Sequence, residues 1–318
     1  QAQIAEGAEF ILARVRAPKE RDGAALGFAT GVMDQHALHK DAYAIPVVLA
    51  GNADSGSLFA GSSEAGVRPN LSERALAYAK AVGFDDDTKA SRAVWMHALA
   101  IGYCPAYLRA NAHGIASGWP RIPLPASAAG LSASSNLGTA IARLLNADSV
   151  LREQGIRGLG FPAASDGGGL SESDLGLTAQ WGLRQREGVI TPSKGKLTER
   201  DYTAEELAAI AEGAESLGMT RDEAVALLGG TCFDVWLNDV AYWRCVPANV
   251  WRYTIGGYQV IKKWLSYRER ALLGRDLKPE EARYVGEMVR RIAALVLMQP
   301  ELDANYERVK ADVWEWGG

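Results

Sequence analysis

The sequence is poor in cysteine and contains no long apolar run. The only cysteines among its 318 residues are Cys104, Cys232 and Cys245, which are far apart. Their odd number and wide spacing provide neither a disulfide framework nor a CxxC metal site, so we expect a cytoplasmic protein. No apolar stretch approaches the roughly 18 residues that a membrane-spanning helix needs. The start of the chain also lacks the layout of a signal peptide, and we expect no membrane partner.

Several motifs of nucleotide-using and hydrolytic enzymes are also absent. The sequence has no Walker phosphate loop, no dinucleotide fingerprint between a strand and a helix, no GxSxG elbow and no HExxH motif. It also has no Asn-Pro-Pro-Tyr/Phe or Asp-Pro-Pro-Tyr/Phe tetrapeptide. These absences argue against catalysis by this chain alone. The first residue is Gln1 rather than Met, so we expect a trimmed or excised part of a longer polypeptide.

The charged residues are unevenly distributed along a chain of ordinary globular composition. Hydrophobic residues make up 48% and charged residues 23%, which is typical of one or two folded domains rather than of disorder. The net charge is −4 overall. Residues 151–230 contain 8 basic and 13 acidic residues, net −5, whereas residues 244–291 contain 11 and 5, net +6. A basic segment inside an acidic chain predicts a localised anion-binding surface.

The order of the expected elements predicts a helix-rich α+β fold in two lobes. The first lobe, residues 1–150, starts irregularly, has a strand candidate near 44–50 and then carries helices between 71 and 147. Residues 155–169 include six glycines, which indicates a boundary or a mobile loop. The second lobe, residues 151–318, begins with this loop and continues with small strands and C-terminal helices. We expect this second lobe to hold the main recognition surface.

Local patterns indicate where several elements begin. Two capping boxes of the S/T-x-x-E type, Thr203 with Glu206 and Thr220 with Glu223, predict two helix starts. Pro279 suits the first turn of a helix that we expect to reach about residue 298. Strands are expected over 233–246 and 250–255, and helices over about 72–82, 88–102, 134–145, 258–272 and 300–312. Residues 70–72, Asn-Leu-Ser, suit a cap for the first of these helices.

The predicted helix over 258–272 has two faces of different chemistry. Tyr258, Ile261 and Trp264 recur at three- to four-residue spacing and are assigned to the core. The other face carries Gln259, Lys262, Lys263, Ser266 and Arg270. A glutamine and three cations on one stripe can contact phosphates and a base edge, and a solvated charged face is the alternative. A turn over 191–200 adds three more cations, Lys194, Lys196 and Arg200.

Other groups of residues have both a chemical and a structural interpretation. A group with metal-ligand spacing is formed by Asp34, His36, His39 and Asp41. If helical, it would suit a divalent ion, and an exposed polar turn is the alternative. An aromatic cluster is formed by Trp236, Trp243, Trp251 and Trp264. It suits either base stacking or a local core. His97 lies between apolar neighbours on a predicted helix, and we expect a hydrogen-bonded core residue.

Three ordered motifs near the end of the chain resemble a known family. They are LNDVAYW from Leu237, VPANVWRYTIGGYQVIKKWLSYRE from Val246 and RYVGEMVRRIAA from Arg283. Further landmarks lie upstream, in the order RPNLS, HALA, CPAY and WPRIPLP, between residues 68 and 125. Together they resemble the C-terminal specificity region of type ISP restriction–modification enzymes and related N6-adenine DNA methyltransferases. The resemblance covers roughly residues 43–310.

The resemblance implies a mixed, helix-rich target-recognition domain without a complete Rossmann methyltransferase core. In such enzymes an upstream domain binds S-adenosylmethionine and methylates a flipped adenine, while the region matched here reads duplex DNA. No cofactor is therefore expected in this chain. S-adenosylmethionine is expected in a methyltransferase catalytic domain, which belongs either to the same polypeptide or to a separate subunit.

The resemblance also implies which residues contact DNA. The cations Lys194, Lys196, Arg200, Lys262 and Lys263 are expected to contact the DNA backbone, with Arg270 as a further candidate, and Gln259 is expected to contact a base or a phosphate. A different function stays open, a non-catalytic protein-interaction module that docks on a methyltransferase subunit. The net charge of −4 and the acidic segment 151–230 favour this alternative.

Overall fold

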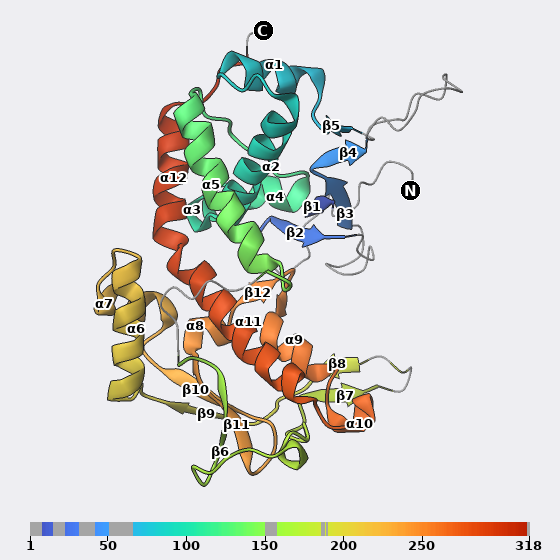
Figure 1. Ribbon diagram of the computed structural model, residues 1–318, viewed down its shortest axis with the longest axis vertical. Coiled ribbons are helices and arrows are strands. Elements are labelled where there is room, and N and C mark those ends of the chain that lie inside the picture. Colours follow the sequence, from blue (N-terminus) through green and yellow to red (C-terminus); the bar gives the residue numbers. More distant parts are fainter. Residues whose placement is uncertain are drawn as a thin grey trace. The chain divides into compact units, whose positions relative to one another are not determined.

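The computed structural model describes residues 8–14, 23–31, 42–50, 66–149, 158–185, 188 and 190–316. The chain forms two compact units. Figure 1 shows their helices and strands, coloured by position in the sequence. Unit 1 comprises Gln1–Ser149 and Gln299–Gly318, and unit 2 comprises Val150–Met298. The predicted second lobe therefore differs from unit 2 at its C-terminal end, because the last helix belongs to unit 1.

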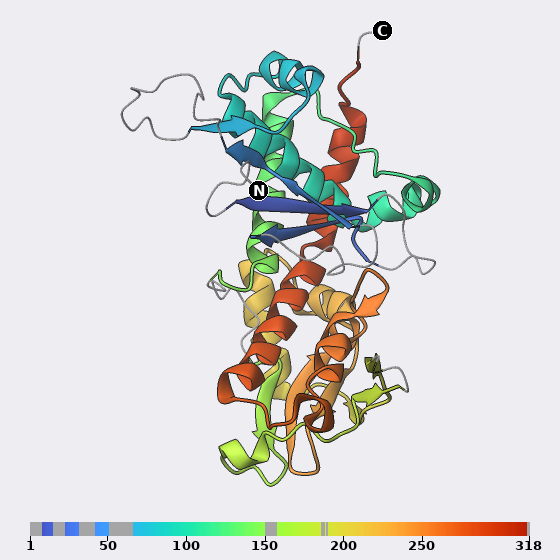
Figure 2. The same ribbon diagram turned by 90° about the vertical axis from the view of Figure 1, so that its right-hand side faces the viewer.

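Unit 1 contains a three-stranded antiparallel sheet that corrects the expected irregular start. The strands lie side by side in the order β2-β1-β3 (Figure 2). Ile11 of β1 pairs with Phe28 of β2 and with Ile45 of β3. The sheet strands are β1 (Glu9–Arg14), β2 (Leu26–Thr30) and β3 (Ala42–Pro46), and β4 (Val48–Ala50) pairs with β5 (Val67–Pro69). Residues 10–13 of the central strand are all buried. Such a run lacks the alternation that identifies a half-exposed strand, so only the region near 44–50 was predicted.

The helices of unit 1 pack around a close contact between α2 and α5 (Figure 1). They are α1 (Glu73–Ala81), α2 (Asp87–Tyr103), α3 (Pro105–Ala110), α4 (Ala112–Ser117), α5 (Ala128–Leu145) and α12 (Gln299–Ala311). A Cβ at Gly138 of α5 would lie 1.7 Å from the carbonyl oxygen of Met96, so only glycine permits this approach. Ser72 caps α1, as predicted, by accepting a hydrogen bond from the Ala75 N–H.

His97 is the expected hydrogen-bonded core residue of unit 1. Its Nδ1 lies 2.7 Å from Ser134 Oγ, and its Nε2 lies 2.8 Å from the carbonyl oxygen of Pro123. Asn305 of α12 donates a hydrogen bond to the same Ser134 hydroxyl at 2.9 Å. Burial lowers the pKa of His97 to about 4, against the opposing effect of the Pro123 carbonyl. This neutral network joins α12 to α2 and α5. The sequence of α12 alone did not indicate which helices it packs against.

Unit 2 is built on a four-stranded antiparallel sheet with the order β6-β11-β10-β9. Its strands are β6 (Phe161–Ala164), β9 (Leu197–Arg200), β10 (Cys232–Trp236) and β11 (Ala241–Pro247). The predicted strand over 233–246 is thus a hairpin. Its turn is closed by Asn238, whose side-chain oxygen accepts hydrogen bonds from the Val240 and Ala241 N–H groups. Two small hairpins pair β7 (Gly182–Arg184) with β8 (Ile190–Pro192) and β12 (Thr254–Ile255) with β13 (Tyr258–Gln259).

The helices of unit 2 begin where local capping predicted two of them. Both capping boxes form, at the starts of α6 and α7. The helices are η1 (Glu172–Asp174), α6 (Ala204–Ser216), α7 (Arg221–Leu228), α8 (Ala248–Trp251), α9 (Val260–Ser266), α10 (Arg270–Leu273) and α11 (Pro279–Leu297). The prediction of a strand over 250–255 is wrong at residues 250–251, which belong to the short helix α8. Helix α11 packs on β11, where Trp243 Nε1 donates to the Ala282 carbonyl at 2.9 Å.

These elements confirm the mixed, helix-rich α+β class. Every strand pair among the described residues is antiparallel, so these residues do not form the parallel sheet of a Rossmann core. Within the same residues, no helix combines the length and the apolar character needed to cross a membrane.

Candidate nucleic-acid interface

The predicted helix over 258–272 is wrong, because the segment contains three short elements. Gly256 and Gly257 have φ of 63° and 81° and form the turn between β12 and β13. Successive positive φ angles are typical of tight hairpin turns and favour glycine. Helix α9 then ends at Ser266, whose hydroxyl donates to the carbonyl oxygen of Lys263, and α10 starts at Arg270. The predicted stripe therefore does not lie on one helix.

Helix α9 presents Lys262 and Lys263, both half-buried. Neither lysine has an ion-pair partner among the described residues. The Nζ of Lys263 lies 4.5 Å from the ring centre of Tyr258 and 4.7 Å from that of Tyr267. Tyr258 was assigned to the core, but its side chain is exposed, as is Tyr267. It lies in the hairpin before α9 and not on the buried face of the helix.

The apolar side of α9 agrees better with the sequence pattern. Ile261 and Leu265 are buried in the core of unit 2. Trp264 packs against this core while half-buried, with its ring 5.8 Å from Tyr284 and 3.9 Å from the guanidinium of Arg268. The assignment of Ile261 and Trp264 to the core is thus confirmed.

The turn that carries Lys194 is joined by hydrogen bonds to the segment after α9. The Ser193 N–H donates to the Trp181 carbonyl at 2.7 Å. The N–H groups of Gln180 and Trp181 in turn donate to the buried carboxylate of Glu269, at 3.2 and 2.7 Å. Helix α9 also packs against β7 and β8. The exposed Lys194 therefore belongs to the same substructure as Lys262 and Lys263, and no described carboxylate pairs with it.

Lys196, two residues further on, has a weak acidic partner. Its Nζ lies 2.9 Å from Asp239 Oδ1 and 4.4 Å from the ring centre of Trp236. The Asp239 side chain is 96% exposed, so water competes for both charges. Exposed ion pairs of this kind typically contribute less than about 1 kcal/mol. Lys196 therefore stays available to another anion.

Arg200 requires a correction, because its guanidinium is fully engaged inside the protein. Nε and Nη2 donate to Asp234, while Nη1 and Nη2 donate to Glu206, at 2.8–3.0 Å. The second Nη1 hydrogen is donated to the Asp201 carbonyl at 3.0 Å. All five donors of an arginine are thereby satisfied. No donor is left for a phosphate, so we remove Arg200 from the candidate DNA contacts.

The two remaining predicted residues are partly engaged. The Gln259 amide nitrogen donates to the Trp251 carbonyl at 3.3 Å, and the side chain is half-buried. Arg270 Nε lies 3.0 Å from Asp276 Oδ1, with a side chain that is 58% exposed. Both residues are weaker candidates for DNA contact than Lys194, Lys262 and Lys263.

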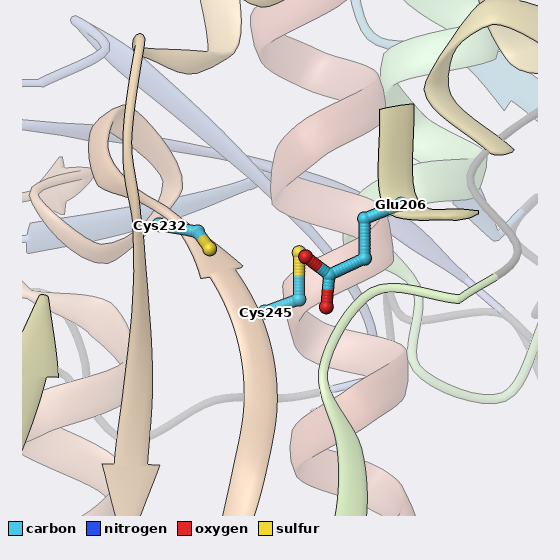
Figure 3. Close-up of side chains that lie close together, drawn as sticks. All are labelled: Glu206, Cys232 and Cys245. Carbon is cyan, nitrogen blue, oxygen red and sulfur yellow. The ribbon is translucent and has the colours of Figure 1, made fainter. Parts of the chain in front are cut away.

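The carboxylate of Glu206 lies beside Cys232 and Cys245, as Figure 3 shows. Its Oε1 accepts from Arg200 and Arg244, and its Oε2 accepts from Arg200 and the Thr203 N–H. These four hydrogen bonds use the roughly four lone-pair sites of a carboxylate. Burial by itself would raise the pKa of Glu206, but hydrogen bonds from Arg200, Thr203 and Arg244 lower it to about 2.

Of the two thiols next to Glu206, that of Cys245 is a poor metal ligand. Hydrogen bonding to Cys232 and burial raise the pKa of the Cys245 thiol. A thiol must lose its proton to ligate a metal, and the neighbouring carboxylate already has its oxygens occupied. We therefore interpret this group as a polar cluster that stabilises the sheet.

Two other candidate groups have different outcomes. Trp243 and Trp251 are buried, which confirms a local core, whereas Trp236 lies half-buried beside Lys196. The proposed metal ligands lie outside the described residues, and their role stays a prediction. They are Asp34, His36, His39 and Asp41.

Comparison with known proteins agrees with the motifs. A family profile described as the Type ISP C-terminal specificity domain matches residues 4–290. Among solved structures, the chain is similar to one described as "ATP-dependent Type ISP restriction-modification enzyme LlaBIII bound to DNA". The TM-score is 0.53 at 12% identity, over 94% of this chain and 16% of that one. A cryo-EM structure of a DrdV–DNA complex gives a TM-score of 0.50 at 12% identity, over 94% and 24%.

At this identity, the structural likeness shows a shared fold alone. The chain spans less than a quarter of the length of either structure. No curated relative matches the chain.

Proposed function

Because this chain belongs to the Type ISP C-terminal specificity domain family, we propose that it recognises the target sequence in duplex DNA. The observation that carries the proposal is the group of lysines on helix α9 and on the turn between β8 and β9, two elements that adjoin because α9 packs against β8. Lys194, Lys262 and Lys263 have no acidic partner among the residues that the structure describes. Both similar structures are described as DNA-bound, which supports the same ligand here.

The lysines would supply affinity and register rather than sequence discrimination. A lysine is a point charge that neutralises a phosphate and releases a counterion, and phosphates do not differ between sequences. Lys196 would also contact the DNA backbone if a phosphate took the place of the Asp239 carboxylate as its ion-pair partner. Base reading requires other side chains. Gln259 is a candidate once its hydrogen bond to Trp251 opens, and Arg270 is a candidate once its ion pair with Asp276 opens.

We further propose that the chain performs no catalysis itself. The missing tetrapeptide and the antiparallel sheets of the described residues support a role limited to recognition. S-adenosylmethionine would then bind a methyltransferase domain on the same polypeptide or on a separate subunit. Calorimetry should detect no binding of S-adenosylmethionine to the purified chain, and measurable binding would contradict this part of the proposal.

The main test is binding of the purified chain to a pool of random duplexes, followed by sequencing of the bound fraction. We expect one sequence to be enriched, with an affinity that falls linearly with the logarithm of salt concentration. Lys310→Ala is a matched control, because Lys310 is a unit 1 lysine that pairs with Glu307. Absence of DNA binding, together with capture of a methyltransferase subunit, would instead favour the protein-interaction module.

A further inference from the structure

The strongest unexplained feature of unit 2 is the arrangement of Tyr258, Lys263 and Tyr267 around α9. Tyr258 begins the second strand of the hairpin before helix α9, and Tyr267 follows the last turn of that helix. Both rings are more than 40% exposed, and neither hydroxyl has a hydrogen-bond partner among the described residues. Two exposed tyrosines on either side of one lysine are not needed to complete the core.

The backbone holds both rings at the lysine ammonium group. Lys263 and Tyr267 are four residues apart on adjoining helical turns, where side chains meet. Tyr258 is placed by its antiparallel pairing with Ile255, which the turn of Gly256 and Gly257 permits. A lysine side chain normally loses considerable rotamer freedom when it binds, and contacts made beforehand reduce that loss.

The charge of Lys263 is retained in this arrangement. A ring face attracts an ammonium group without neutralising it, in contrast to a carboxylate. Of the described lysines that lie over aromatic rings, Lys196 also pairs with Asp239, and Lys310 also pairs with Glu307. Lys263 has two rings and no described carboxylate. It is therefore oriented and still able to attract an anion.

We propose that Tyr258 and Tyr267 are positioning residues that hold Lys263 Nζ ready for a phosphate of the DNA backbone. The inference rests on the proposed function, since it assigns part of the same binding surface. The ligand group is a phosphodiester oxygen, so the contact is independent of base sequence. The rings act through Lys263, which separates this role from direct stacking on a base.

A double-mutant cycle tests this dependence on one duplex enriched from the random pool. Lys263→Ala should weaken binding about five-fold at moderate salt and reduce the salt slope by about 0.9, the contribution of one phosphate contact. The pair Tyr258→Leu and Tyr267→Leu should cause most of the same loss. In the Lys263→Ala background, that pair should cause no further loss.

A ring-retaining variant separates the ring from the hydroxyl. Tyr258→Phe with Tyr267→Phe should keep the wild-type salt slope and at least half of the affinity, because the ring faces remain. A loss equal to that of the leucine pair would overturn the positioning role. This variant also keeps the test decisive if the leucine pair unfolds, which thermal melting detects.

The outcomes distinguish this inference from the proposed function. If the wild-type chain binds no duplex, the proposed function fails, and the inference that rests on it fails with it. If the wild type binds and Lys263→Ala has the same slope as Lys310→Ala, only the inference fails. Additive losses in the cycle would also overturn it, because the tyrosines would then contact DNA independently of Lys263.

Discussion

Two regions of unit 2, the Glu206 cluster (Arg200, Glu206, Asp234 and Arg244) and the α9 segment, use basic residues in opposite ways. In the Glu206 cluster, Arg200 of β9 and Arg244 of β11 donate to the buried carboxylate of Glu206. On α9, Lys262 and Lys263 have no described acidic partner, and Lys263 lies between two exposed rings. Arg200 and the two lysines were alike predicted to contact the DNA backbone. The comparison teaches that the partner of a cation, rather than its presence, decides whether it is engaged in the fold or stays available to a ligand.

Burial explains why the two regions respond differently to substitution. The Glu206 and Asp234 side chains are only 5% and 13% exposed, so their charges depend on Arg200. Removing one member of such a network leaves an uncompensated buried charge. The half-buried α9 lysines have no described acidic partner, so loss of one of them leaves no buried carboxylate without its counter-charge and should have little effect on the folded state.

The largest expected effect is that of Arg200→Ala on stability. It should lower the free energy of unfolding by about 3–5 kcal/mol, because Glu206 and Asp234 lose their main counter-charge. Urea denaturation followed by tryptophan fluorescence measures this change. Full stability combined with weaker DNA binding would show that Arg200 contacts DNA after all.

Acid should destabilise the Glu206 cluster, because Glu206 becomes protonated. Its pKa in the folded state is about 2, below the ordinary value of 4.5, so its stabilisation is fully present above about pH 4.5. That stabilisation is lost as the pH falls from 4.5 towards 2, on the order of 3 kcal/mol in all.

Urea midpoints between pH 6 and pH 2.5 measure this dependence. Glu206→Gln should be less stable at pH 6 and should lack the Glu206 part of the acid dependence. The α9 variant Lys262→Ala should keep the wild-type dependence. An unchanged acid profile in Glu206→Gln would show that other carboxylates are responsible.

Lys194 and Lys262, which have no described acidic partner, should affect DNA binding without affecting stability. Lys194→Ala combined with Lys262→Ala should reduce the salt slope by about 1.8, because two phosphate contacts are lost. The free energy of unfolding should change by less than about 0.5 kcal/mol. Anisotropy titrations at several salt concentrations give the slope. A slope equal to the wild type would remove both residues from the interface.

The smallest expected effect is that of Asp239→Asn. This change frees Lys196 from its exposed partner, and such pairs contribute less than about 1 kcal/mol. DNA affinity should therefore rise by less than about five-fold, with the largest rise at low salt. Lys196→Ala should abolish the rise. Weaker binding of Asp239→Asn would indicate that Asp239 itself contacts the ligand.

Features that depend on neighbours within about four residues were predicted from the sequence. The capping boxes of α6 and α7, the Ser72 cap and the start of α11 at Pro279 each use groups close together in the chain. The core position of His97 followed from its apolar surroundings on one helix. Ordered motifs also identified the family across most of the chain.

Partners distant in the sequence were not predictable in this way. Arg200 binds Asp234, 34 residues away, and α12 joins unit 1 through Asn305 and Ser134, 171 residues apart. Tyr258 is exposed because it lies in the β12–β13 hairpin, although its spacing from Ile261 and Trp264 is that of one helix face.

The amino-acid order alone thus determined the starts of α1, α6, α7 and α11, the α+β class and the family, because these follow from local hydrogen bonding and from ordered motifs. Only the tertiary structure decided which cations are neutralised. Charge pairing depends on three-dimensional distance, which residue spacing does not encode.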